Sequence, residues 1–145
     1  MMNRIKLREG LRPLLLSLLT AIAGFSCTAH APSGAGPSAE ISVDQRNAGS
    51  TVSVKRGDRL AVTLAGTPST GFIWELLSGA GSVLTPQGEP RFTPGGSVPG
   101  AGGLYRFSFT AAAKGKVHLK FAYRRPFEAG VAPAATFEVT VEVSQ

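Results

Sequence analysis

The sequence predicts an all-β protein, an immunoglobulin-like antiparallel β-sandwich of about seven strands. Beyond residue 40, apolar and polar residues alternate with a period of two, which is typical of strands that have one face on a core. The same region shows no helical periodicity. Turn residues are frequent, with 18 Gly and 10 Pro among 145 residues. Together these observations favour a sandwich, and an up-and-down barrel is the alternative.

The first 27 residues are typical of a signal peptide. A basic segment, residues 1–12, precedes an apolar run over residues 13–25, which is short for a membrane span. Two processing routes fit: acylation of Cys27, or cleavage after Ala31. We favour acylation, although Gly24 stands where such lipoprotein motifs usually carry Leu. We therefore expect an exported protein, either a cell-envelope lipoprotein anchored by acylated Cys27 or a periplasmic or secreted protein.

Residues 28–39, "TAHAPSGAGPSA", have the composition of a flexible tether. The folded domain is then residues 40–145. Because Cys27 is the single cysteine of the chain, this domain has no disulfide and its core alone must stabilise it.

Alternating apolar residues mark the strands in order. The first four are short, and the last three are longer and extend over Tyr105–Phe109, Val117–Tyr123 and Phe137–Val143. The short ones are centred on Ile41 and Val43, on Val52 and Val54, on Leu60, Val62 and Leu64, and on Phe72, Trp74 and Leu76. A tight turn, "RGD" at Arg56–Asp58, separates the second strand from the third. Residues 85–103 are rich in Gly and Pro, and we expect them to form one long, mobile loop.

The net charge of +6 does not indicate a nucleic-acid-binding protein. Residues 1–12 contribute +3 of this charge, and the remaining Lys and Arg are spread singly along the chain. We expect no nucleic-acid partner.

The chain also lacks the residue sets that catalysis or metal binding requires. His118 is the only histidine of the folded region and lies on the polar face of a strand, so no nucleophile–base pair is indicated. The histidines and the cysteine lie in separate segments without metal-ligand spacing. Glu138 and Glu142 lie on one strand face among solvent-side threonines, so we expect them to aid solubility and not to act as a catalytic pair. We expect no enzyme activity, metal, cofactor or small-molecule substrate.

Three turn segments are more elaborate than sandwich turns need to be. The first lies in "TPSTGFIW", where Pro68 fixes its own φ and Gly71 can adopt a positive φ. The others are "GAGG", residues 100–103, and "RRPF", residues 124–127.

These three segments, in this order, resemble the chagasin family of inhibitors of papain-like cysteine proteases, over about residues 41–143. Two positions depart from the family pattern: Thr67 replaces Asn, and Phe127 replaces Trp, which removes an N–H donor. The resemblance assigns protease contact to twelve residues: Thr67, Pro68, Ser69, Thr70, Gly71, Phe72, Gly100, Gly102, Gly103, Arg125, Pro126 and Phe127.

The resemblance implies a sandwich whose three loops lie at one end and enter the protease cleft as a wedge. Ser69 would lie nearest the protease's catalytic Cys and His, and inhibition would be reversible and non-covalent. The expected partner is a papain-like cysteine protease, and the inhibitor would be a monomer. The alternative is a non-inhibitory immunoglobulin-like module, tethered to the envelope for binding or adhesion.

Overall fold

The computed structural model describes residues 38–145, and the predicted signal peptide, Cys27 and almost all of the tether lie outside them. The described chain contains nine strands and two short 3₁₀ turns. The strands are β1 (Glu40–Asp44), β2 (Thr51–Lys55), β3 (Arg59–Gly66), β4 (Ile73–Ser78), β5 (Leu84–Pro86), β6 (Arg91–Pro94), β7 (Gly103–Ala111), β8 (Gly115–Arg124) and β9 (Ala135–Ser144). The 3₁₀ turns are η1 (Gln45–Asn47) and η2 (Pro68–Thr70). No helix within residues 38–145 is long and apolar enough to cross a membrane.

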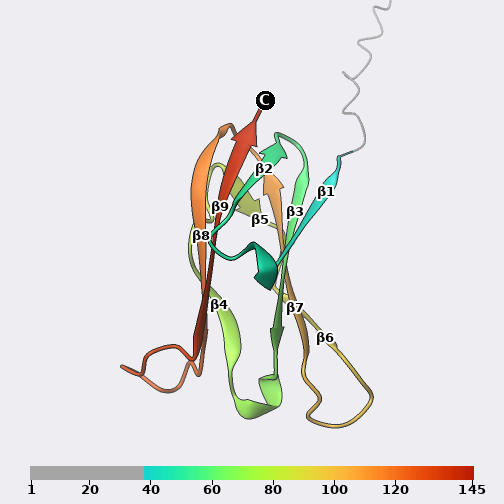
Figure 1. Ribbon diagram of the computed structural model, residues 1–145, viewed down its shortest axis with the longest axis vertical. Helices are drawn as coiled ribbons and strands as arrows, with labels where there is room; N and C mark the ends of the chain where they lie inside the picture. Colours follow the sequence, from blue (N-terminus) through green and yellow to red (C-terminus); the bar gives the residue numbers. More distant parts are fainter. Residues whose placement is uncertain (1–37) are drawn as a thin grey trace, which may run out of the picture. The chain divides into compact units, whose positions relative to one another are not determined.

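The strands form two sheets that pack face to face, which confirms the predicted sandwich (Figure 1). One sheet has the order β1-β3-β7-β5, with β6 also paired to β7, and the other has the order β2-β9-β8-β4. The predicted alternation places its apolar residues between the sheets. Leu60, Val62 and Leu64 of β3 face Leu119 and Phe121 of β8, and all five are fully buried.

The core is complete within the described residues. Its buried apolar side chains all lie between Val43 and Val143, and no buried side-chain nitrogen or oxygen atom there is left without a hydrogen-bond partner. Such a core is typical of a single folding unit of about a hundred residues.

Two features differ from the sequence prediction. The sheets are mixed, because β1 pairs with β3 and β2 pairs with β9 in parallel. Between β1 and β3 the chain crosses to the other sheet to form β2, so it reverses direction twice. As a result, β1 and β3 run in the same direction. The predicted long loop over residues 85–103 is also wrong in part, because β6 and most of β5 lie within it and pair with β7. Phe92 of β6 packs on Tyr105, with ring centroids 5.0 Å apart.

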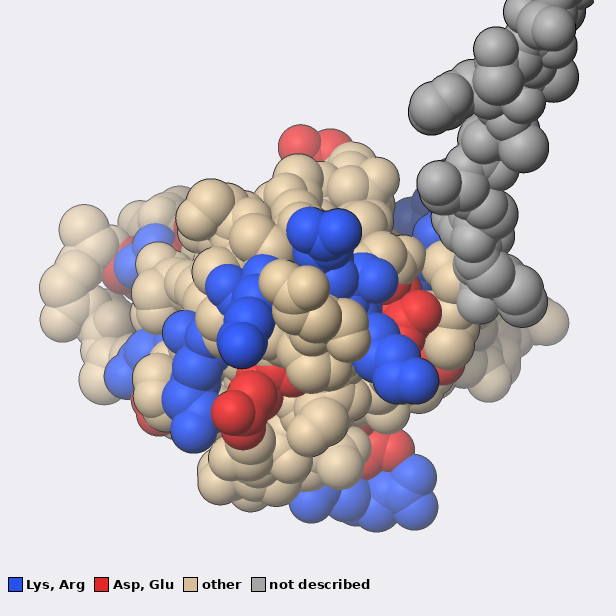
Figure 2. Space-filling view, turned by 90° about the horizontal axis from the view of Figure 1, so that it is seen from above, with Lys and Arg blue, Asp and Glu red and all other residues tan. Residues whose placement is uncertain are grey.

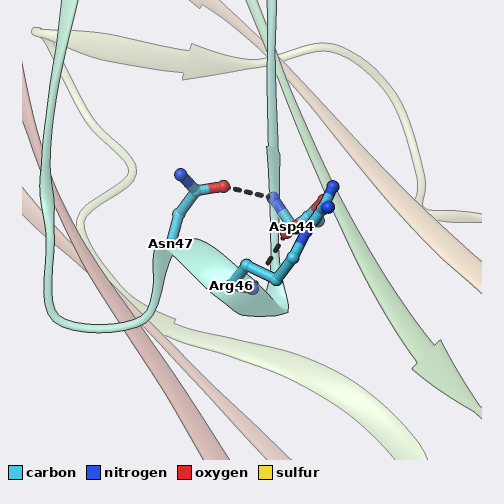
Figure 3. Close-up of polar contacts among 3 residues, drawn as sticks. All are labelled: Asp44, Arg46 and Asn47. Atoms are coloured by element: carbon cyan, nitrogen blue, oxygen red, sulfur yellow. Dashed lines mark hydrogen bonds and ion pairs between the residues drawn. The ribbon is translucent and has the colours of Figure 1, made fainter.

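The corner between β1 and β2 is held by a local polar network (Figure 3). The Arg46 backbone N–H donates to Asp44 Oδ1 at 2.9 Å, and the Asp44 N–H donates to Asn47 Oδ1 at 3.0 Å. The Arg46 side chain also binds the Asp44 carboxylate, with Nη2 2.6 Å from Oδ2. These bonds satisfy the donors of η1 and turn the chain from one sheet to the other.

Other sequence predictions are confirmed. Arg56–Asp58 forms the tight turn between β2 and β3, with Gly57 at φ 94°. His118 is exposed and hydrogen-bonded to Thr140. The side chain of Glu138 forms an exposed ion pair with Lys120 across the sheet.

Arg46 sets the ionisation of Asp44. Its side-chain hydrogen bonds, and next the hydrogen bond from its backbone N–H, hold the pKa of the Asp44 carboxyl below its usual range. A lowered pKa contributes stability that is present above the unfolded pKa and is lost as the pH falls through the folded value. We predict that Arg46→Ala raises the Asp44 pKa towards its usual value, measured by NMR titration of the carboxyl carbon. Arg91→Ala, an exposed change elsewhere, serves as the control, and an equal pKa in the wild type and Arg46→Ala would contradict the assignment.

Candidate functional site

The three segments singled out in the sequence lie at the same end of the sandwich, opposite the C-terminus (Figure 1). We call them the 67–72 loop, which joins β3 to β4, the 95–102 loop, which joins β6 to β7, and the 125–134 loop, which joins β8 to β9. Direct contacts connect the first of these to each of the other two.

The 67–72 loop is a compact turn that is closed by its own hydrogen bonds. The Thr70 N–H and hydroxyl both donate to the Thr67 carbonyl, at 3.1 and 2.6 Å, and the Gly71 N–H donates to the Pro68 carbonyl at 2.9 Å. Gly71 ends the turn at φ 82°, a conformation that favours glycine. Ser69 and Thr70 are exposed at the tip. The Thr67 hydroxyl makes no capping bond to this turn, and Thr67 holds the turn through its backbone carbonyl.

An aromatic cluster fixes the base of this loop. The Tyr123 hydroxyl accepts a hydrogen bond from the Thr67 N–H at 2.8 Å, and its ring lies 5.3 Å from that of Phe72 and 5.1 Å from that of Trp74. Trp74 is buried, and its indole N–H donates to the Ala65 carbonyl at 2.8 Å. Tyr123 and Phe72 therefore connect the turn to the buried Trp74 of the core.

Arg125 attaches the 125–134 loop to this cluster. Its guanidinium lies 4.4 Å from the centre of the Phe72 ring, and its Nε donates to the Thr70 carbonyl at 3.1 Å. It also pairs with Glu128 at 2.9 Å, so its charge is balanced within the loop. Phe127 follows and is 73% exposed, although its ring edge covers Gly71 so closely that a Cβ there would lie 3.2 Å from Cζ.

The 95–102 loop approaches from the other side. The Ser69 hydroxyl donates to the Gly100 carbonyl at 3.3 Å, and Gly100 has φ 82°. A Cβ on Gly102 would lie 3.1 Å from the Thr67 hydroxyl oxygen. Gly103, which we assigned to the loop, instead begins β7, where a Cβ would collide with the Thr93 carbonyl and with the ring of Phe92. Because Gly103 has no side chain, β6 can pair closely with β7 at this position.

The end of the sandwich exposes apolar side chains around a small polar tip. Val98 in the 95–102 loop is 74% exposed, Val131 in the 125–134 loop 59% and Leu104 at the start of β7 49%. With Phe127, they make up four of the five large apolar side chains that the described part of the chain exposes. Such clustering marks an interaction surface. Val98, Leu104 and Val131 are not among the residues that the sequence motifs identify, although an apolar residue within a Gly- and Pro-rich loop is a signal that points to Val98.

The tip of this surface is uncharged. It consists of the exposed residues Ser69, Thr70, Pro126 and Phe127, which present hydroxyls and apolar groups but no ionisable side chain. Within residues 38–145, no group of three or more His, Cys, Asp or Glu residues could hold a metal ion. A hollow of the described domain lies away from the loop tips, between β4, the β5–β6 connection and β7.

Sequence comparison connects this chain to a family of inhibitors. Residues 53–141 match the profile described as chagasin family peptidase inhibitor I42. Amoebiasin-1 of Entamoeba histolytica is 30% identical over 104 residues, which cover 71% of this chain and 99% of that protein. Chagasin of Trypanosoma cruzi is 30% identical over 90 residues, which cover 59% of this chain and 81% of that protein.

Solved structures share the fold. The cysteine protease inhibitor EhICP2 of Entamoeba histolytica superposes with a TM-score of 0.67 at 18% identity, and the match covers 75% of this chain and 99% of that one. PbICP-C, solved in complex with falcipain-2, superposes with a TM-score of 0.50 at 17% identity, over 73% and 99% of the two chains.

We predict that Tyr123→Phe loosens the 67–72 loop. Without the hydroxyl, the half-buried Thr67 N–H loses its partner, which costs about 1–3 kcal/mol of unfolding free energy. Tyr105→Phe is the matched control, because its hydroxyl makes only a long contact of 3.5 Å with the Phe72 carbonyl. Urea denaturation of both variants measures the difference, and equal losses would contradict the anchoring role of Tyr123.

Proposed function

Because this chain belongs to the chagasin family of peptidase inhibitors, we propose that it inhibits papain-like cysteine proteases by inserting its three loops into the active-site cleft. The complex forms without a covalent bond and dissociates reversibly. The relatives are protease inhibitors and not enzymes, which agrees with the absence of catalytic residue sets from the sequence.

One observation carries this proposal: the three loops are connected to one another before any partner binds. Ser69 contacts Gly100 in the 95–102 loop, and Thr70 contacts Arg125 in the 125–134 loop. A surface that is already ordered loses little conformational entropy on binding, so more of its contact energy appears as affinity.

The conformation of the tip explains how it could occupy a protease without being cleaved. Proteases generally bind a substrate segment in extended form, and cleavage requires the reacting atoms to be aligned. Residues 68–70 instead form a 3₁₀ turn, which the Thr70 and Gly71 N–H groups close. We therefore assign Ser69 the position nearest the catalytic Cys and His, where its small side chain fits a narrow cleft.

The flanking side chains supply the contact area. Phe127 exposes most of its ring beside the tip, and Val98 exposes its side chain on the opposite side. Arg125 holds the 125–134 loop in place, so that Phe127 is presented as a fixed aromatic anchor, the type of residue that dominates interface energy. Gly100 and Gly102 let the backbone of the 95–102 loop approach the partner closely.

We extend the proposal to the place of action. Residues 1–27 direct export, and the inhibitor acts outside the cytoplasm, either as a lipoprotein acylated on Cys27 or as a periplasmic or secreted protein released by cleavage after Ala31. Labelling of cells with a palmitate analogue distinguishes the two routes. Acylation of Cys27 predicts that the wild type is labelled and that Cys27→Ala is not, whereas an unlabelled wild type favours cleavage after Ala31.

The decisive test is titration of papain with the purified domain, with trypsin as the control. We expect saturable inhibition of papain, no inhibition of trypsin, and full recovery of papain activity on dilution. Undisturbed papain activity at saturating doses of folded protein would refute the proposal, and inhibition that persists after dilution would refute reversibility.

We predict that Ser69→Arg together with Thr70→Glu abolishes inhibition. Both side chains lie at the exposed tip, so larger charged groups would block entry into the cleft. The melting temperature should fall by only a few degrees, because these are surface positions. Ser82→Arg with Thr85→Glu, also exposed but in the β4–β5 region, is the matched control and should leave inhibition unchanged. Retained inhibition in the tip variant would show that the 67–72 loop is not the contact.

We also predict that Phe127→Ala weakens inhibition of papain about 5- to 150-fold, the range that corresponds to loss of one aromatic anchor. Stability should change little, because the ring is 73% exposed. Leu77→Ala, which truncates an exposed side chain outside the three loops, is the control. Inhibition constants for both variants give the comparison, and equal effects would remove Phe127 from the site.

A further inference from the structure

Basic residues gather at the end of the sandwich that lies opposite the three loops. Figure 2 looks onto this end and shows Lys and Arg side chains over it. We call this surface the basic end. It consists of Lys55, Arg56 and Arg59 around the β2–β3 turn, and Lys114 and Lys116 around the β7–β8 turn, and all five residues are exposed.

Backbone hydrogen bonds bring these separate segments together. The Arg56 N–H donates to the Ser144 carbonyl at 2.9 Å, and the Gly57 N–H donates to the Ala111 carbonyl at 2.8 Å. Gly115 lies opposite Val143 in the β8–β9 ladder. The two turns and the C-terminal strand therefore form one surface, so the sequence-based expectation of singly spread cations does not hold for these five.

The basic end carries most of the net charge of the described domain. Residues 38–145 contain eleven Lys and Arg and eight Asp and Glu. The basic end holds five of the cations, and its acids are Asp58, Glu142 and Glu40, which lies opposite Arg59 and is paired with Arg106, whereas the rest of the domain holds six cations and five acids. Lys116 lies 3.9 Å from Glu142, a loose exposed pair, and Lys55, Arg56, Arg59 and Lys114 take part in none of the ion pairs within residues 38–145.

The chain enters the domain at this same end. The Ala39 N–H donates to Asp58 Oδ1 at 3.0 Å, and the Arg59 N–H donates to the Ala39 carbonyl at 2.8 Å. These bonds hold Ala39 beside the β2–β3 turn and occupy the acid of that turn. The residues that precede Ala39 in the sequence are therefore joined to the domain at its basic end.

We propose that the basic end docks on an anionic phospholipid surface and turns the three loops away from it. Lipid phosphates complement a patch that has a surplus of exposed Lys and Arg, and each such residue near the surface contributes about fivefold to the partition coefficient. Strand β7 alone, which runs from the loop end to the basic end, has nine residues and spans roughly 30 Å. A domain docked in this way would hold its loops clear of the lipid and open to a protease.

Two observations favour a membrane over other polyanions. The entry point of the chain at Ala39 lies on this surface, so an anchor on residues 1–37, such as acylated Cys27, would be attached beside the cations that contact the lipid. The five cations also come from the segments around two turns at one end, whereas Phe127, the exposed aromatic side chain of the described residues, lies in a loop at the opposite end, so the patch offers no ring for stacking on a base.

The test is cosedimentation with vesicles, without any protease. It uses residues 28–145, which contain the complete core and lack the apolar segment 13–25 that would bind lipid by itself. One set of vesicles contains equal parts of phosphatidylglycerol and phosphatidylcholine, and the other contains phosphatidylcholine alone. We expect binding to the anionic vesicles only, with loss of binding as salt screens the charges. Equal binding to both sets, or to neither, would overturn the proposal.

Two matched variants locate the contact. Lys55→Gln, Arg56→Gln and Lys114→Gln together should lower partitioning onto anionic vesicles about 150-fold at low salt. Arg46→Gln, Arg91→Gln and Lys120→Gln together remove the same charge from positions outside the basic end and should retain most of the binding. Equal losses in the two variants would show that binding depends on net charge and not on this surface. A separate measurement compares binding to duplex DNA, and tighter binding to DNA than to anionic vesicles would also overturn the proposal.

A last measurement tests the orientation. If the loops point away from the lipid, protein bound to anionic vesicles should inhibit papain with the same constant as free protein, and a vesicle-bound domain that no longer inhibits would overturn the orientation. Because vesicle binding is measured first and without papain, failure of docking and failure of inhibition are separate results.

Discussion

The arrangement of the three loops depends on the stack formed by Arg125, Phe72 and Tyr123. The guanidinium covers one side of Phe72, Tyr123 stacks with Phe72 from the core side, and the Tyr123 hydroxyl holds the backbone of Thr67. This stack explains why "TPSTGFIW" passes from a turn into large apolar residues without a charge. The apolar residues pack on Tyr123 and so fix the base of the short polar turn. Without these rings the turn would keep its internal hydrogen bonds and the bond from Ser69 to Gly100, but it would lose its attachment to the core and to the 125–134 loop.

The sandwich separates two surfaces of different chemistry. One end is uncharged at its tips and exposes apolar side chains, whereas the other carries the surplus of Lys and Arg. The core between them contains no buried polar or charged side chain within the described residues. A domain without disulfides obtains its stability from this apolar layer. The residues at the two ends contribute less to stability, so they can differ in charge and polarity.

Much of this arrangement could be predicted from the sequence. Strict alternation located the longer strands, and three motifs in fixed order located the loops, because each depends on local features such as Pro68, Gly71 and Pro126. Contacts between distant segments could not be predicted. Tyr123 appeared only as one apolar residue of a strand, and its bond to Thr67 depends on how β8 packs beneath the loop. The parallel pairing of β1 and the gathering of Lys55 and Lys114 likewise follow from topology, which periodicity does not encode.

The claim that three connected loops act as one preformed wedge is tested most directly by a crystal structure of this domain bound to papain. The account predicts that all three loops lie in the active-site cleft, with Ser69 nearest the catalytic cysteine. It also predicts that the contacts of Ser69 with Gly100 and of Thr70 with Arg125 are retained. A complex in which only one loop enters the cleft, or in which papain binds a face of either sheet, would contradict it.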